Sequence, residues 1–268
     1  MVKNTTIKYP IDDKWFYEDS KYENIYAPLT TDTVIYKFIK LDYFILMLKN
    51  KKIRLEKIIS WDDPFENLIL KCECVTKNNI PISLDNLKNS IYGTCFSEID
   101  ESDAFWRIYS PNQDGVRLKT TVGKFFDYLY GDGFTNSGKI SMFFKQVEYV
   151  EENNFLQIIK DPTLVKEQIF KEKPNEAVFM KRKAFSHENE VRFIYSIATD
   201  HHDFGKDYVE FDVDVNDIFD EVTEDPRLND SEFEKVKSQL ETYGFKGEIN
   251  KSSLYGAPNY KMIIDLDV

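Results

Sequence analysis

The stretch that decides the fold is Glu188-Asn189-Glu190-Val191-Arg192, which leads into the apolar run Phe193-Ile194-Tyr195-Ser196-Ile197. β-branched and aromatic residues are typical of strands, and residues 190–197 form the best strand candidate in the chain. On a strand, alternate side chains share a face, so residues 188, 190 and 192 would place two carboxylates beside a guanidinium. This charged start of an apolar strand is the most informative feature of the sequence.

Other strands and helices follow on both sides without a regular order. We predict strands at residues 33–38, 52–55, 91–97, 115–119, 140–150, 207–213 and 261–266, with 207–213 pairing with 190–197 as a hairpin. We predict helices at 41–50, 121–130, 162–171, 175–185 and 230–243, the last capped by Asp230 and ended by Gly244. Because no strand–helix–strand rhythm is present, the sequence favours an α+β fold with a mainly antiparallel, split sheet and flanking helices.

The length and composition indicate a packed globular protein. The chain has 268 residues, including 21 Phe and 16 Tyr, which is enough to bury a sizeable core. Residues 1–32 are irregular and are predicted to form an N-terminal arm lying on the body. Residues 33–268 are predicted to form a single α+β domain.

Charge and cysteine content limit the compartment and the partners. The formal net charge is −12, which disfavours large-scale binding to duplex phosphate backbones. No apolar run approaches the ~18 residues of a membrane span, and the N-terminus lacks the apolar core of a signal peptide. The three cysteines are few and odd in number, which argues against a disulfide framework. We therefore expect a cytoplasmic protein with no membrane partner.

Two further clusters have an ordinary structural explanation. Cys72-x-Cys74 would place two thiols on one face of a strand, but no second Cys or His pair with ligand spacing accompanies it, so no metal site is predicted. Lys181-Arg182-Lys183 is the most compact basic cluster and is expected to be a solvated helix end.

The Glu188–Arg192 stretch has two interpretations. In one, Arg192 pairs with Glu190 and the stretch is only an ion-paired strand edge. In the other, Glu190 faces a cleft and stabilises positive charge that develops during a reaction, a contribution worth about 3–4 kcal/mol. The choice depends on where the Glu190 carboxylate points.

Three more motifs could contribute chemistry. Ser102 is predicted to cap a short helical turn through Trp106-Arg107-Ile108-Tyr109-Ser110, whose aromatics could stack on a flat ring, although Trp106 could equally be core. Tyr36-Lys37-Phe38 could direct Lys37 into a cleft. Trp61-Asp62-Asp63-Pro64-Phe65-Glu66 could bind Mg²⁺, but a turn capped by the Asp that precedes Pro is the favoured explanation.

These blocks together resemble a bacterial family that is catalogued only as a domain of unknown function. The resemblance rests on Tyr36-Lys37-Phe38, Asp63-Pro64-Phe65-Glu66, Trp106-x-x-Tyr109-Ser110 and Glu188-x-Glu190-Val191-Arg192, which span most of the chain. Members of that family often lie near mobile or phage-defence genes. The family name implies no reaction.

A second, weaker resemblance is to ADP-ribosyltransferases, which bind NAD as a co-substrate in the cleft of a small split sheet. That family uses an Arg or His on the first strand, a Ser or Tyr in the middle of the chain and a late Glu, often in Glu-x-Glu. The order here is Tyr36 or Lys37, then Tyr109-Ser110, then Glu188-x-Glu190. The chain departs from the pattern at the first position and lacks the Ser-Thr-Ser motif.

The resemblance implies a role for each matched residue. Glu190 would hold the nicotinamide ribose and stabilise the oxocarbenium ion, Glu188 would orient the acceptor, and Tyr109 would stack on nicotinamide. Lys37 would contact the phosphates. The remaining cofactor-binding residues implied are Tyr36, Trp106, Ser110 and Arg192.

Three functions follow as hypotheses. The first is an NAD-dependent ADP-ribosyltransferase-like toxin or phage-defence effector that modifies a protein or nucleic acid and has a cognate antitoxin or defence partner. The second is a non-catalytic binding protein, such as a sensor, antitoxin or inhibitor partner. The third is a metal-dependent nuclease that uses Asp62, Asp63, Glu66 and Glu190. Convergence of Tyr36 or Lys37, Tyr109 and Glu190 on one cleft is the geometric requirement of the first.

Overall fold

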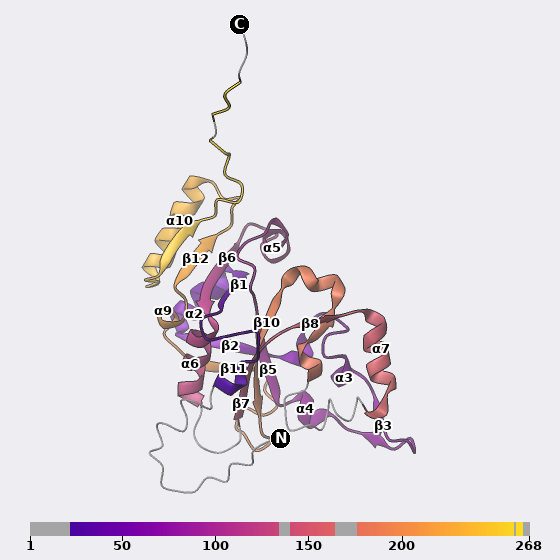
Figure 1. Cartoon of the computed structure of the whole chain (residues 1–268). Coiled ribbons are helices and arrows are strands. Elements are labelled where there is room, and N and C mark those ends of the chain that lie inside the picture. Colours follow the sequence, from indigo (N-terminus) through magenta and orange to yellow (C-terminus); the bar gives the residue numbers. More distant parts are fainter. Residues whose placement is uncertain (1–21, 134–139, 164–175, 260, 265–268) are drawn as a thin grey trace.

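The computed structural model describes residues 22–133, 140–163, 176–259 and 261–264 (Figure 1). Within these ranges, no helix combines the length and apolar character that crossing a bilayer would need. A large central sheet is flanked by helices, so the predicted α+β class is confirmed.

The large sheet is antiparallel at every pairing except one, that of β12 with β13. Along one path its order is β11-β2-β5-β1-β6-β12-β13, while β10 pairs with β5 on one side and with β7 on the other. Its strands are β1 (Val34–Lys40), β2 (Lys52–Lys57), β5 (Ile91–Ser97), β6 (Gly115–Thr121), β7 (Ile140–Gln146), β10 (Glu190–Ile197), β11 (Tyr208–Asp212), β12 (Glu221–Glu224) and β13 (Glu248–Lys251). Two smaller sheets join β3 (Cys74–Val75) to β4 (Pro81–Ile82) and β8 (Glu148–Val150) to β9 (Met180–Arg182).

The sheet splits at β5, as the sequence predicts. β10 pairs with β5 over its whole length, whereas β1 meets β5 only at Tyr36↔Ser97 and β2 meets it only at residues 92 and 93. The stretch between these two contacts, around Cys95, therefore borders a gap on that edge of β5. The gap opens toward the candidate site described below.

β10 divides its side chains between two clusters. Val191, Phe193, Tyr195 and Ile197 belong to the main core, where Phe193 contacts Phe125 of the covering helix at a ring-centroid distance of 5.2 Å. The alternate side chains point to the other face, where Ile194 packs in a second cluster with Ile58, Leu70, Ile91, Val178 and Phe179. Glu190 and Arg192 share the face of Ile194, because side chains alternate along a strand.

Short helices surround the sheet. The α-helices are α2 (Leu41–Asn50), α3 (Leu68–Lys71), α4 (Asp85–Lys88), α5 (Asp103–Tyr109), α6 (Val122–Gly133), α7 (Glu152–Lys160), α9 (Val215–Ile218) and α10 (Asp230–Thr242). The 3₁₀ turns are η1 (Tyr22–Asn24), η2 (Ile58–Ser60), η3 (Glu176–Phe179) and η4 (Lys183–Glu188). α6 lies over the main core, while α3 and α7 lie toward the opposite end of the molecule from α10 (Figure 1).

Two predicted pairings and boundaries are wrong. The strand at 208–212 pairs with β2 and not with β10, because both edges of β10 are already occupied by β5 and β7. The predicted strand at 140–150 is two strands, since the backbone N–H of Val147 leaves the ladder and donates to the carbonyl of Glu190 at 2.8 Å.

Other differences lie outside the large sheet. Residues 176–185 of the predicted helix 175–185 form 3₁₀ turns around β9, and α7 was not predicted; most of the predicted helix 162–171 lies outside the described residues. Asn229, not Asp230, caps α10, through a capping box with Glu232. Residues 261–264 form no strand and extend away from the body (Figure 1). Residues 1–21 of the predicted arm lie outside the described residues.

Candidate active site

A cleft of about 640 Å³ opens beside the gap in the sheet. Its lining includes Tyr36 and Lys37 of β1, Tyr109 at the end of α5, and Glu188 and Glu190 at the start of β10. These residues come from three distant parts of the sequence. The geometric requirement stated for a transferase site, convergence of Tyr36 or Lys37, Tyr109 and Glu190 on one cleft, is therefore met.

Glu190 lies at the floor of the cleft and is 3% exposed. Its Oε1 accepts a hydrogen bond from Arg192 Nε at 2.7 Å, and its Oε2 accepts from Lys181 Nζ at 2.9 Å. Burial opposes ionisation of the carboxyl, but the charges of Arg192 and Lys181 outweigh it and lower the pKa of Glu190 to about 2. The carboxylate thus faces the cleft and is also ion-paired, so it combines both interpretations of the sequence.

Arg192 lies behind Glu190 and is fully buried. Its Nη1 donates to the Val178 carbonyl and its Nη2 to Glu66 Oε1, both at 2.6 Å. Burial works against the charged form, but Glu190 and the other acidic neighbours raise the pKa of Arg192 above its ordinary value. Arg192 does not line the cleft. Its observed role is to position two carboxylates, those of Glu66 and Glu190.

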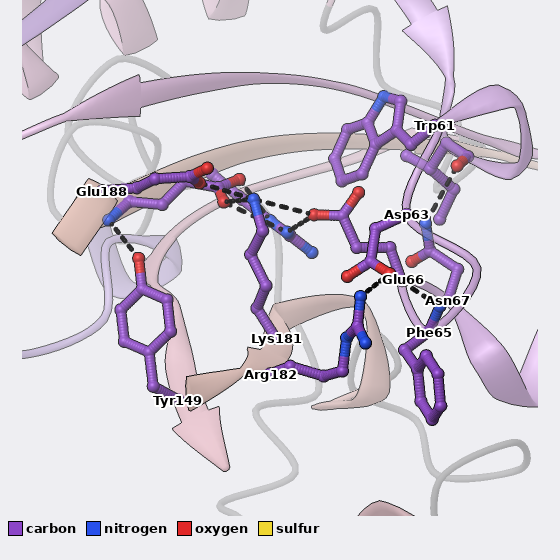
Figure 2. Close-up of polar contacts among 12 residues, drawn as sticks. Trp61, Asp63, Phe65, Glu66, Asn67, Tyr149, Lys181, Arg182 and Glu188 are labelled. Carbon is purple, nitrogen blue, oxygen red and sulfur yellow. Dashed lines mark hydrogen bonds and ion pairs between the residues drawn. The ribbon is translucent and has the colours of Figure 1, made fainter. Parts of the chain in front are cut away.

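Lys181 joins three carboxylates at the edge of the cleft. Its Nζ lies 3.1 Å from Glu66 Oε1 and 2.9 Å from Glu190 Oε2, and it also donates to Glu188 Oε2 (Figure 2). Burial disfavours the ammonium, but these carboxylates outweigh it and raise the pKa of Lys181. The expectation of a solvated helix end is wrong for Lys181, which is 8% exposed and lies on β9.

The charges of this cluster do not balance. Three carboxylates (Glu66, Glu188 and Glu190) form direct ion pairs with two cations (Lys181 and Arg192), which leaves one more carboxylate than cations in direct contact. Lys37 feels the charge of Glu190 from a greater distance and forms no ion pair with the three carboxylates. The negative charge is least favoured at Glu188, because burial raises the pKa of its carboxyl even though Lys181 donates a hydrogen bond to it. A buried floor with excess negative charge favours a cation placed against it.

Local backbone features bring the two glutamates together. Glu188 ends η4 and is not on the strand, and Asn189 follows it in the left-handed region with φ 40°. The Glu188 carbonyl accepts from Ser97 Oγ at 2.6 Å, and the backbone N–H of Glu190 donates to Tyr149 Oη at 2.8 Å (Figure 2). The predicted placement of residue 188 on the strand is therefore wrong, but the turn at 188 and 189 still brings the Glu188 and Glu190 carboxylates to the same partner, Lys181.

The Asp-Pro turn supplies the opposite wall. Asp63 Oδ1 accepts from the backbone N–H of Phe65 at 3.0 Å, as predicted for a capped turn, and also from Arg182 Nη2 at 2.9 Å. Asn67 takes the left-handed conformation with φ 56° and donates to the Ile58 carbonyl at 2.9 Å. This turn directs Glu66 inward to Arg192 and Lys181 (Figure 2).

Lys37 reaches the cleft through the split in the sheet. Its Nζ donates to Thr94 Oγ1 at 2.6 Å and to the Cys95 carbonyl at 3.1 Å, both neutral acceptors. Burial lowers the pKa of Lys37, although Cys95 and Glu190 oppose the shift. Burial also raises the pKa of the Cys95 thiol well above its ordinary value, which makes it a poor nucleophile.

Aromatic side chains form one wall of the cleft. Tyr109 stacks on Phe38 at a centroid distance of 6.1 Å and 27° between ring planes, and it is 38% exposed. Burial of the hydroxyl and the nearby Glu188 raise the pKa of Tyr109. Trp61 and Phe185, which were not singled out as ligand-binding residues, line the cleft as well. Such a wall can accept a flat ring.

Besides Arg192, two more of the predicted cofactor-binding residues, Trp106 and Ser110, do not line the cleft. Trp106 is fully buried, packs edge-on against Phe38 at 5.2 Å, and donates from Nε1 to Glu101 Oε1 at 2.7 Å. Ser110 is buried and donates to Asp225 Oδ2 at 2.6 Å. Trp106 is a buried residue of α5 and Ser110 is its C-cap, so both support that helix.

The carboxylates of the nuclease hypothesis are largely engaged by cations. Asp63 pairs with Arg182, and Glu66 and Glu190 pair with Arg192 and Lys181, so a Mg²⁺ ion would have to compete with these cations for the carboxylates. Among the described residues, the one group of His, Cys, Asp and Glu side chains with metal-ligand proximity is His201, His202 and Asp203. That group lies outside the cleft.

Comparison with known proteins identifies a family match over part of the chain. Residues 105–193 match the family described as "Protein of unknown function (DUF2971)". This segment contains the blocks at 106–110 and 188–192, so the predicted resemblance to a family of unknown function is confirmed there. No curated protein matches the chain.

Three solved structures of DarT from Thermus sp. 2.9 are similar to this chain. The complex with ADP-ribosylated ssDNA has 12% identity and a TM-score of 0.38, with 84% of this chain and 96% of that chain covered. The complex with NAD+ has 12% identity and a TM-score of 0.37, with 84% and 97% covered. The complex with carba-NAD+ has 12% identity and a TM-score of 0.35, with 83% and 97% covered.

Proposed function

We propose that this protein binds NAD+ in the cleft and transfers its ADP-ribose to a macromolecular target, as a toxin or phage-defence effector. The observation that supports this most is the cleft floor, where three carboxylates share two cations beneath a wall of aromatic rings. The nicotinamide ring of NAD+ is flat and positively charged. It would satisfy both the aromatic wall and the excess negative charge.

The reaction would develop positive charge next to Glu190. When the bond between ribose C1′ and the nicotinamide nitrogen breaks, its electron pair moves to the ring and neutralises it, and the ribose becomes an oxocarbenium ion. A fixed carboxylate at that position stabilises the ion without reorganisation. The pKa of about 2 keeps Glu190 ionised throughout the physiological range, which suits an electrostatic role and not that of a general base.

Glu188 and Lys37 would complete the site. A bond then forms between C1′ and an acceptor nucleophile, whose proton must leave. Glu188 also lines the cleft, and its raised pKa makes it the better proton acceptor of the two glutamates. Lys37 contacts neutral oxygens, so its charge is available to a phosphate group of the nucleotide.

One observation favours a second candidate, a non-catalytic binding protein. Glu190 is 3% exposed and is held by both Arg192 and Lys181, which is also how a purely structural carboxylate would be arranged. In that case the cleft would bind a cationic ligand or partner side chain without reaction. Copurification of a stoichiometric partner, with no thermal shift on addition of NAD+, would favour this candidate.

Nicotinamide release from NAD+ separates the two candidates. We expect wild-type protein to release nicotinamide and Glu190→Gln to lose at least about 100-fold of that rate, because the side chain stays in place while its charge is lost. The matched control is Asp63→Asn, which changes a carboxylate that lines the same cleft but belongs to a separate pair with Arg182.

The controls decide how a loss is interpreted. Asp63→Asn should keep most of the activity, and circular dichroism melts should show that both variants are folded. A Glu190→Gln protein as active as wild type would end the transferase assignment, whereas equal losses in both variants would remove any special role of Glu190.

A further inference from the structure

A second group of side chains with chemical potential lies outside the cleft. His201, His202 and Asp203 are consecutive in the connection between β10 and β11, at the opposite end of β10 from Glu190. None of the three lines the cleft. We propose that they form a binding site for a divalent transition-metal ion of the Zn²⁺ type.

The separations of the ligand atoms fit such an ion. The Asp203 Oδ2 atom lies 3.1 Å from His202 Nε2 and 3.7 Å from His201 Nδ1, and all three ligand atoms lie within 4.8 Å of one another. Zn²⁺ binds imidazole nitrogen and carboxylate oxygen at about 2.0–2.2 Å in tetrahedral geometry, which places neighbouring ligand atoms about 3.3–3.5 Å apart. These two distances lie on either side of that range, and the third, between the two imidazole nitrogens, is at most 4.8 Å. An ion would draw the two imidazoles together by up to about 1.5 Å to complete the three-ligand face.

The backbone that carries the ligands is fixed before any ion binds. The Asp203 carbonyl lies 2.9 Å from Tyr92 Oη of β5, and the Gly205 carbonyl accepts from Lys57 Nζ of β2 at 3.0 Å. The backbone N–H of Gly205 donates to the Asn89 carbonyl at 3.0 Å. The turn is thus tied to two strands of the sheet, which lowers the ordering cost of forming the site.

Contacts of Lys206 and of the Asp203 backbone N–H compete with the ion for two of the ligand residues. Lys206 pairs with Asp203 through Oδ1, whereas Oδ2 is the oxygen turned toward both imidazoles. The Asp203 backbone N–H donates to His201 Nδ1 at 3.2 Å, so that nitrogen is unprotonated, as coordination requires. An ion would replace this long hydrogen bond. The His202 side chain is 78% exposed, which gives the ion and a water in its fourth position access from solvent.

The donor set selects the class of metal. Two imidazoles and one carboxylate suit Zn²⁺ and its neighbours in the first transition series. Mg²⁺ and Ca²⁺ prefer sites made of oxygen alone. A bound ion would fasten the connection between β10 and β11 and stabilise the edge of the sheet that β11 forms with β2.

Isothermal titration of the full-length, tag-free protein with ZnCl₂ tests the site. We expect one ion per chain for wild type, no heat with MgCl₂, and affinity weakened by at least about tenfold in His202→Ala. His187→Ala is the matched control, because His187 is exposed and lies outside the group. A double variant, Cys72→Ala with Cys74→Ala, excludes zinc held by the two thiols and should bind as wild type does.

Thermal melts give a second readout that does not depend on activity. Saturating Zn²⁺ should raise the Tm of wild type and of both control proteins by a few degrees and leave that of His202→Ala unchanged. The proposal is overturned if wild type binds no Zn²⁺, if His202→Ala binds as tightly as wild type, or if binding is lost in the cysteine double variant.

Discussion

Arg192 has the most unusual environment of any single residue described in the site. It is a fully buried cation whose partners are Glu66, from the Asp-Pro turn, and Glu190, at the start of β10. Its guanidinium also lies 4.7 Å from the centroid of the Trp61 ring. Removing one partner from a buried charge network costs far more than breaking an exposed ion pair, because the remaining charges lose both a partner and solvent.

Arg192→Met should therefore be strongly destabilising. The variant leaves three carboxylates around Lys181 alone, and we expect the free energy of unfolding to fall by about 3–5 kcal/mol. Urea denaturation followed by fluorescence measures this loss. Arg182→Met is the control, because Arg182 is partly exposed and pairs with one well-placed carboxylate, Asp63. If both variants lose the same stability, the buried charge network around Arg192 stabilises the fold no more than the Arg182–Asp63 pair does.

Glu224 shows the opposite situation, a buried carboxyl without a partner. It lies on β12, is fully buried, and neither oxygen has a hydrogen-bond partner among the described residues. Burial and the nearby Glu234 raise the pKa of Glu224 to about 8, although Lys251 opposes the shift. At neutral pH the native state therefore keeps the Glu224 proton, whereas the unfolded chain, with an ordinary Glu pKa of about 4.3, has already lost it.

The pH dependence of stability follows from this difference. The contribution of protonated Glu224 is complete below about pH 4.3 and is lost as pH rises to about 8, at a limit of about 1.4 kcal/mol per pH unit. Glu224→Gln does not titrate, so its stability relative to wild type should increase steadily between pH 5 and 8. Urea midpoints of both proteins over that range check this, and parallel curves would contradict it.

Individual site residues were predictable where their chemistry is local. The Asp63 cap and the pairing of Glu190 with Arg192 follow from neighbours in the sequence, and both are present. Lys181 could not be assigned, because its partners Glu66, Glu188 and Glu190 surround it only once β9 lies beside β8. Trp106 lies on the same short helix as Tyr109 and Ser110 is the C-cap of that helix, but side chains next to one another along a helix point in different directions.

At the scale of elements, α5 holds Tyr109 at the cleft and begins with a predicted cap. Ser102 Oγ accepts from the backbone N–H of Phe105 at 3.1 Å. α10 begins with the comparable cap Asn229, whose side chain accepts from the backbone N–H of Glu232 at 3.0 Å, but Asn229 does not line the cleft. The two caps offer a matched pair, because loss of either should cost about 1 kcal/mol.

Ser102→Ala and Asn229→Ala should thus differ in function and not in stability. Both should lower the free energy of unfolding by a similar amount in urea. We expect weaker NAD+ binding in calorimetry only for Ser102→Ala, because fraying of a seven-residue helix moves Tyr109 away from the wall. Equal NAD+ affinities would show that α5 contributes nothing to the ligand site.

Pairing partners were harder to predict than the elements themselves. The strand at 208–212 was expected from its composition, yet its partner depends on which strand edges are free after the sheet has formed. β10 has none, because β5 and β7 occupy both of its edges. Apolar alternation reports which face of a strand is buried and contains no information on its neighbours.

At the scale of the whole molecule, the split in the sheet creates the site. β1 and β2 reach β5 at different positions, and Lys37 extends through the gap toward Cys95. The cleft then collects Tyr109 from α5 and the two glutamates from the start of β10. The antiparallel α+β class was predictable from the irregular order of elements, but the gap itself depends on long-range pairing.

We propose that the cleft recognises a flat cation above a negatively charged floor. NAD+ and NADH carry the same phosphates and adenine, and they differ in the charge and planarity of the nicotinamide ring. Titration calorimetry of both ligands with the wild-type protein therefore measures this preference for a flat cation directly. We predict that NAD+ binds at least about tenfold more tightly than NADH, a difference of about 1.4 kcal/mol. Equal affinities, or tighter binding of NADH, would contradict it.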